Sequence, residues 1–284
     1  MNGVVTILGN TAILFAILIV VFRLIDLLRP RDERLPIFRK NRATDYAYWI
    51  FGPLVTENLS KISAFAALAP ISLLAFGKVD TNLIMHGFGP ASRLTVWLQI
   101  VLITIIGDFS SYWMHRAFHR GRLWNFHAIH HSIVDLDWLS SLRVHPLNDA
   151  LMRIAGTLPV VALGFAPAAY AGVVVFFGLF AILVHANVDW DWGPLRTVFV
   201  SPRFHRWHHT SEAEGRDKNF AGFLPVWDIL FGTYYMPDGK LPRVFGTATP
   251  VPSGLWGQLL FPFRHSAITP RVPVPRVMRS RSTS

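Results

Sequence analysis

The 284-residue sequence contains no cysteine. Disulfide bonds, thiolate zinc sites, iron–sulfur clusters and catalysis by a cysteine nucleophile are therefore excluded, and any metal ion must be bound through nitrogen or oxygen. The sequence also lacks the GxGxxG fingerprint of flavin and nicotinamide cofactors and the CxxCH haem-attachment motif. A redox enzyme with this sequence would have to receive its electrons from an external donor.

Charged residues are also scarce, at 15% of the chain, whereas 52% of the residues are hydrophobic and the mean hydropathy is +0.37. This composition is typical of a membrane protein. The formal net charge of +10 could indicate nucleic acid, but the basic residues lie between and after apolar segments instead of forming one stripe. Basic charge beside membrane-spanning segments explains this pattern better, so we expect no nucleic-acid partner.

The first apolar segment, residues 4–28, is long enough as a helix to cross a hydrocarbon layer of about 30 Å. The linker that follows, residues 29–42, carries six basic residues and two acidic ones. Because cytoplasmic loops are enriched in lysine and arginine, we expect this linker in the cytoplasm and the N-terminus outside.

A second apolar region, residues 46–76, is interrupted by Gly52-Pro53 and by Glu57, Asn58 and Lys61. This predicts an interfacial first part followed by a short span over residues 62–76. The loop 77–92 contains one basic residue and is expected outside. The apolar segment 94–114 would then cross back and deliver His115 to the cytoplasmic side.

A third apolar block, residues 151–183, is split at 164–167 and predicts a hairpin of two short helices that returns His185 to that same side. We therefore expect an all-α, multi-span integral membrane protein with a histidine-rich dimetal site at its cytoplasmic face. The expected organisation is an N-terminal part with membrane helices and the basic linker, a central dimetal domain and a solvated Pro/Arg-rich tail: residues 1–92, 93–240 and 241–284.

Eight of the twelve histidines lie in three short strings, HRAFH, HAIHH and HRWHH. On a helix, residues three and four apart share a face, so each string could direct its imidazoles at one metal ion. Neutral imidazole binds iron, zinc, copper or nickel, and eight imidazoles exceed the six positions of an octahedral ion. The sequence therefore predicts two metal ions, with these ligands: His115, His119, His127, His130, His131, His205, His208 and His209.

Two further histidines could be ligands. His185 is followed by Asn187 and Asp189, which a helical turn would bring near the same ion, although His185 could instead cap a helix. His145 precedes Pro146, which disfavours a helix-interior position and leaves both a ligand role and a structural role open.

Asp108 lies within an apolar segment, where an acid is costly without a partner. A hydrogen bond from a metal-ligating imidazole would supply that partner, and Asn187 and Asp189 could serve similarly. His86 and His265 are expected to be plain surface residues.

Taken with DFSSYWM, RVHP, HANVDW and KNFAGFLPVWDILFGTYY, the three strings resemble the fatty acid hydroxylase superfamily, also called the sterol desaturase family, over residues 94–235. The resemblance implies an integral membrane, non-haem di-iron oxidoreductase in which the eight motif histidines are the iron ligands. His185 resembles a further family histidine, and Asp189 stands where some members have another. No catalytic residue beyond the metal ligands is implied.

The implied reaction is an O2-dependent hydroxylation or desaturation at an unactivated C–H bond of a membrane lipid. The substrate could be a sterol, a fatty acyl chain, a carotenoid or an ether lipid. Because the sequence encodes no redox group other than the metals, we expect an external electron donor: a reductase, a ferredoxin, a cytochrome or a reduced pterin.

Two other classes of protein remain possible. In a di-zinc membrane hydrolase the metals would activate water, with a general base such as Glu212 or Glu214, which follow the third string in an apparent loop. A non-catalytic metal-handling or pH-sensing protein would use histidines that titrate near neutral pH. Transport would, however, require ionisable residues along several spans, and the histidines cluster at one face.

Overall fold

The computed structural model describes residues 2–28, 42–79 and 86–264. Within these ranges the regular structure is helical, and the β-structure is confined to a single isolated bridge between Thr210 and Phe245. The all-α prediction is therefore confirmed for this part of the chain. The basic segment 29–41, His265 and the terminal arginines lie outside the described residues.

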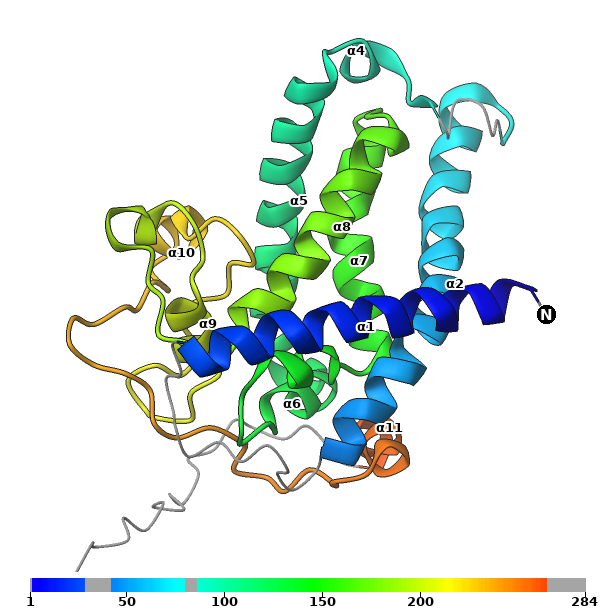
Figure 1. The fold of residues 1–284 in the computed structure, drawn as a ribbon. Helices are drawn as coiled ribbons and strands as arrows, with labels where there is room; N and C mark the ends of the chain where they lie inside the picture. Colours follow the sequence, from blue (N-terminus) through cyan, green and yellow to red (C-terminus); the bar gives the residue numbers. More distant parts are fainter. Residues whose placement is uncertain (1, 29–41, 80–85, 265–284) are drawn as a thin grey trace, which may run out of the picture.

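Three apolar helices form the centre of the fold: α5 (Val96–Phe118), α7 (Pro146–Ala162) and α8 (Pro167–Val184) (Figure 1). Of the described helices, α5 is the one that is long and apolar enough to cross a membrane. Its exposed face carries large apolar side chains, including Trp97, Val101 and Ile105. Their spacing of four residues places them in one stripe, which is the surface that hydrocarbon would cover.

The split predicted in the third apolar block is confirmed, because α7 and α8 are separated by residues 163–166. Close backbone contact holds this turn against the segment that precedes α5. The N–H of Phe88 donates to the carbonyl of Gly164 at 2.9 Å, and Gly164 has a φ of +85°. A Cβ on Gly164 would lie 2.1 Å from the Phe88 carbonyl oxygen, so only glycine fits there.

Helix α2 (Arg42–Phe76) corrects one prediction. The Gly52-Pro53 pair does not end the helix, which continues for 35 residues through Pro53 and Pro70. Proline removes one backbone hydrogen bond and kinks a helix, but the flanking turns and tertiary packing can keep the helix continuous. Figure 1 shows α2 changing direction partway along its length, as a kinked helix does.

Helix α1 (Asn2–Leu28) lies across the other helices. It runs horizontally in both views, nearly perpendicular to α5 in Figure 1. Leu18 and Phe22 are buried against Trp49 and Trp138, so the contact is a well-packed aromatic cluster. The segment expected to be the first span therefore does not run alongside α5.

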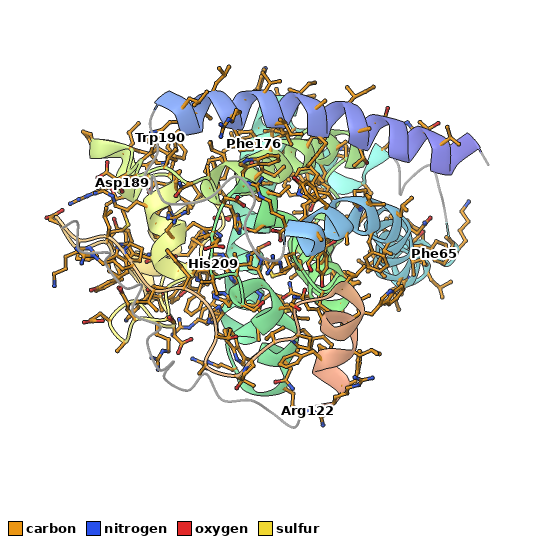
Figure 2. The ribbon with its side chains drawn as sticks, turned by 60° about the horizontal axis from the view of Figure 1, so that its bottom comes forward. Phe65, Arg122, Phe176, Asp189, Trp190 and His209 are labelled. Carbon is orange, nitrogen blue, oxygen red and sulfur yellow. The ribbon has the colours of Figure 1, made fainter. Side chains whose placement is uncertain are left out.

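The end of the molecule that holds the histidines contains several short elements, which in Figure 1 lie below the central helices or beside their lower parts. They are η1 (Gly121–Leu123), α6 (Trp124–His131), η2 (Trp138–Leu142), η3 (Gly193–Thr197), α9 (Pro202–His208), α10 (Val226–Leu230) and α11 (Leu255–Arg264); α4 (Gly89–Ser92) lies at the opposite end. Figure 2 turns this end forward and shows His209 near its middle. The histidine strings therefore share one end of the fold.

Helix α11 corrects the expectation of a solvated tail. Phe261 is buried in one cluster with Tyr48, Trp124 and Ile129. The prolines and arginines after residue 250 suggested a solvated chain, but the apolar run within α11 covers the outer side of α6. This helix therefore supports a histidine-bearing element from outside.

Candidate metal centre

Five histidines form the first group at this end of the fold. One ring nitrogen from each lies within 4.8 Å of those of the others. The Nε2 atom of His127 lies 3.0 Å from that of His115 and 3.1 Å from that of His131, which in turn lies 3.0 Å from that of His208. The group combines the end of α5 with α6 and α9: His115, His119, His127, His131 and His208.

Four histidines form a second group of the same kind, again within 4.8 Å of one another. The Nε2 atom of His185 lies 3.1 Å from that of His130 and 3.0 Å from that of His205, which lies 3.1 Å from that of His209. The structure thus brings together all eight motif histidines and His185, in two groups of five and four.

The division of each HxxHH string corrects the expectation that its three imidazoles share one ion. On α6, His127 and His131 belong to the first group and His130 to the second. On α9, His205 and His209 belong to the second group and His208 to the first. Residues four apart lie on one helical face, whereas consecutive residues point about 100° apart, so each helix serves both groups.

The Nδ1 atoms, which point away from the centre of each group, determine the tautomer of several histidine rings. Nδ1 of His115 lies 2.7 Å from the Phe220 carbonyl oxygen, and Nδ1 of His208 lies 3.0 Å from that of Lys218. A carbonyl oxygen can only accept, so each of these Nδ1 atoms carries the proton and each Nε2 atom presents a lone pair. The lone pairs converge on the interior of the group, where a cation could bind them.

The geometry fits a metal ion. Metal–imidazole distances are about 2.1 Å, so adjacent nitrogens around an octahedral ion lie about 3.0 Å apart. The spacings in both groups match this value. Burial lowers the pKa well below 6.5 for the histidines of α6 and α9, so these rings are neutral at pH 7 and competent as ligands: His127, His130, His131, His205, His208 and His209.

The segment after α9 supplies several outward partners. Besides the Lys218 and Phe220 carbonyls, the Asp217 carboxylate lies 3.0 Å from Nδ1 of His119. Asn148 on α7 supports His127 at 2.8 Å, and the Arg143 carbonyl supports His130 at 3.2 Å. Such outward bonds orient ligating imidazoles and raise their basicity.

Asp108 has a different partner from the one predicted. Its carboxylate accepts hydrogen bonds from the backbone N–H groups of Phe223 and Leu224 and from the Trp227 indole, at 2.9, 2.9 and 3.0 Å. These bonds satisfy the buried acid without an imidazole. Asp108 therefore anchors the segment after α9 to α5 and acts on the histidines only through that segment.

Asp228 plays a similar part and was missed. It is fully buried and accepts from the N–H groups of Phe220 and Ala221, both at 2.8 Å, and from the Thr233 hydroxyl at 2.6 Å. An acid within the apolar stretch VWDILF was the available signal. A buried carboxylate in such a stretch needs donors, and exposed backbone N–H groups of a loop provide them.

A buried ion pair supports the second group. The Arg143 guanidinium donates to the Asp45 carboxylate on α2, with its Nε at 2.9 Å, and both side chains are almost wholly buried. Because the Arg143 carbonyl faces His130, the pair links α2 to a candidate ligand. The sequence offered no sign of this contact, since the partners are 98 residues apart.

The remaining predicted residues lie outside the two groups. His145 caps α7 by accepting from the Leu147 N–H at 3.1 Å, and its Nε2 lies 3.2 Å from the Leu259 carbonyl oxygen. Asp189 forms a two-bond ion pair with Arg203, at 2.6 and 3.0 Å, instead of approaching His185. Asn187 is buried, and His86 is exposed as expected.

The comparisons with known proteins agree with this architecture. The family model for fatty acid hydroxylase matches residues 100–233, which contain both histidine groups. Over this segment the chain is similar to the fatty acid hydroxylase/sterol desaturase superfamily. No solved structure matches the chain.

Several curated relatives are similar over the same part. The ornithine lipid hydroxylase OlsE of Rhizobium tropici is 35% identical over 58% of this chain and 50% of its own length. The alkylglycerol monooxygenase of Homo sapiens is 34% identical over 51% of this chain and 32% of its own length. A probable Delta(7)-sterol 5(6)-desaturase of Neurospora crassa is 26% identical over 51% of this chain and 40% of its own length. The chain thus spans half or less of these relatives.

Proposed function

We propose that this protein is a di-iron enzyme that uses O2 to hydroxylate a membrane lipid. Two observations carry the proposal: two groups of buried histidines whose Nε2 atoms have the spacing of metal ligands, and a match to relatives named as hydroxylases and monooxygenases. The proposed ligands are His115, His119, His127, His131 and His208 for one iron and His130, His185, His205 and His209 for the other. His145, Asn187 and Asp189 are left out of this set.

Iron with nitrogen ligands and open positions supplies O2 chemistry that the side chains alone cannot perform. The residues of the chain prepare the site for it. Burial keeps the imidazoles neutral, the outward Nδ1 bonds fix their orientation, and rings such as Phe220 and Trp124 pack against His119 and exclude water. The two electrons for each turnover come from an external donor.

The lipid would approach from the side of α5 and α10. On α5, Trp113 packs against Phe231, which follows α10, with ring centroids 4.8 Å apart, and both side chains are exposed, as is that of Leu230. A patch of this kind on a protein with an apolar helix is suited to contact with hydrocarbon. We therefore propose that a membrane lipid approaches the protein along this side.

We also propose that the protein is a multi-pass membrane protein with the metal centre on the cytoplasmic side and residues 93–240 as its catalytic domain. The arginine-rich sequence before α2 supports this orientation. Hydroxylation is favoured over desaturation because the relatives above 30% identity are named as hydroxylase or monooxygenases, and the sterol desaturases are 24–26% identical.

The di-zinc hydrolase is the second candidate, but neither of the two glutamates expected as its general base lies at the groups in the described part of the chain. The Glu212 carboxylate accepts from the Arg243 backbone N–H, and Glu214 is exposed. Asp217 is bonded to the outward side of His119, away from the converging nitrogens. These positions favour O2 chemistry over hydrolysis.

The test is turnover of a lipid extract under labelled oxygen gas with a chemical reductant. A hydroxylated product should carry one atom from the gas, and none should form under argon. Label arriving from water, or product formed without oxygen and reductant in a preparation that retains its metals, would overturn the proposal. A desaturated product without label would support the superfamily chemistry but correct the choice of hydroxylation.

A further inference from the structure

Asp217 connects the five-histidine group to the molecular surface. Its carboxylate bonds to Nδ1 of His119, and the Asp217 side chain is 48% exposed whereas that of His119 is 5% exposed. Asn148, which bonds to His127 in the same group, is buried. A group that an external molecule can touch is thus in direct hydrogen-bond contact with a candidate iron ligand.

The backbone around Asp217 is held in a defined shape. Asp217 and Asn219 have φ values of +55° and +59°, in the left-handed region that few residues other than glycine adopt. The buried Asn219 side chain fixes this conformation by donating to the carbonyls of Phe204 and Tyr235 and accepting from the Tyr235 N–H. Such a conformation persists only where the surroundings hold it, and here it keeps the Asp217 carboxylate on His119.

Basic side chains surround this contact. Arg216, Arg120 and Lys218 all lie near enough to Asp217 to stabilise its charge. In the two segments that meet here, residues 119–123 and 214–218, four basic residues outnumber two acidic ones. Arg122, which is exposed, lies at the edge of this end of the molecule in Figure 2.

We propose that this basic surface, formed by Arg120, Arg216 and Lys218 around Asp217 and extended by the nearby exposed Arg122 of the segment 119–123, is the docking site of an acidic one-electron carrier protein. The proposal rests on the proposed function. With iron bound by the histidines, each docking event would transfer one electron from the reduced carrier to the metal by way of Asp217 and His119, so that the carrier is oxidised and the metal reduced. Two events supply the two electrons of one turnover.

A carrier protein fits this surface better than other donors do. Electron transfer weakens steeply with distance, so a protein-bound redox centre must dock where a ligand is close to the surface. Complementary charge around that point speeds and orients the encounter. A small reductant would need a pocket instead, and it would gain nothing from a ring of arginines outside the site.

The first experiment measures docking on the metal-free protein in nanodiscs, so that it does not depend on iron or activity. The probes are an acidic plant-type ferredoxin and, as a charge control, a basic cytochrome c. The ferredoxin should bind at low salt, more weakly as salt increases, and the cytochrome should not bind. The double variant Arg120→Glu with Arg216→Glu should weaken ferredoxin binding at least about tenfold.

Arg93→Glu is the matched control, because Arg93 is exposed and follows α4 at the opposite end of α5. It should leave ferredoxin binding unchanged. Equal affinity for wild type and the double variant, or an equal loss from Arg93→Glu, would overturn the docking site. The docking site would also be overturned if the double variant lost binding to anionic lipid vesicles but kept its affinity for ferredoxin, because the surface would then bind lipid headgroups.

The second experiment tests the route through Asp217. Asp217→Gly keeps the left-handed backbone and removes the carboxylate, whereas Asp217→Asn keeps an oxygen that can accept from His119. In the iron-loaded protein, Asp217→Gly should slow reduction by ferredoxin at least about tenfold without weakening its binding, and Asp217→Asn should be less affected. Unchanged reduction in Asp217→Gly would exclude the route. Failure of the oxygen-label experiment instead, with docking intact, would count against the proposed function alone.

Discussion

Asp228 holds His115 through a single residue. The Asp228 carboxylate accepts from the Phe220 N–H at 2.8 Å, and the Phe220 carbonyl oxygen lies 2.7 Å from Nδ1 of His115. The Asp228 carboxylate and the His115 ring are therefore hydrogen-bonded to the N–H and the carbonyl of the same residue, Phe220. An acid that touches no histidine ring thereby sets the position of one.

Asp228→Asn should lower the free energy of unfolding by about 1–3 kcal/mol, because a fully buried carboxylate loses charge-assisted hydrogen bonds from Phe220, Ala221 and Thr233. It should also weaken metal retention, since Phe220 would no longer be fixed against His115. Denaturant unfolding and metal content measure the two effects. Asp238→Asn makes the same change at an exposed residue and should alter neither by much.

Single histidine variants should remove the ions separately. With iron supplied during purification, the wild type should hold about two ions per chain, His208→Ala should lose mainly the ion of the five-histidine group, and His130→Ala that of the other. Metal analysis with a spectroscopic signature for each site checks this. Activity should be lost in both variants.

His145→Asn is the contrasting variant. Asparagine also caps helices, so α7 should retain its first turn, and both ions should remain because His145 belongs to neither group. His86→Ala should behave likewise, since His86 is exposed. Loss of one ion from either variant would contradict the ligand set proposed here.

The stability of the metal-free protein should fall in acid. Burial lowers the pKa of the histidines on α6 and α9 below 6.5, so between that value and the folded pKa the unfolded chain binds more protons than the folded one. The free energy of unfolding should therefore be highest above about pH 6.5 and decrease as the pH falls below it. Unfolding curves from pH 7.5 to 5.5 would show this, and greater stability at the acidic end would refute it.

The natural absence of cysteine makes the membrane orientation directly measurable. Glu214→Cys and His86→Cys place single thiols at exposed residues: Glu214 lies between α9 and α10, and His86 lies three residues before α4, which stands at the opposite end of α5. An impermeant maleimide added to intact cells should label His86→Cys only, and Glu214→Cys should react after the cells are opened. Labelling of both thiols in intact cells would show that the metal centre does not face the cytoplasm.

The helical elements around the histidines could be predicted from local sequence. Apolar length located α5, and the split at residues 164–167 located the α7 and α8 hairpin. These features depend on residues that are close in sequence, and the hydrophobic pattern of a local segment is sufficient to predict them. Pro53 misled because packing sustains a helix that the local rule would break.

The assignment of histidines to two groups could not be predicted from spacing alone. His130 and His131 are equally compatible with one ion until the positions of α5, α8 and α9 are known. Asp108 and Asp228 presented the same difficulty, because their partners are backbone N–H groups of a distant loop. The pattern of side chains in a sequence does not show which backbone N–H groups the fold makes available as donors.

The pairing of neighbours across the two groups has a consequence for how the centre assembles. His130 and His131 on α6, and His208 and His209 on α9, are adjacent in sequence but belong to different groups. An ion bound in either group fixes the rotation of both helices, which is the rotation that the other group requires. The first ion therefore bears the entropy cost of ordering, and the second should bind more tightly, with a sigmoidal loading curve.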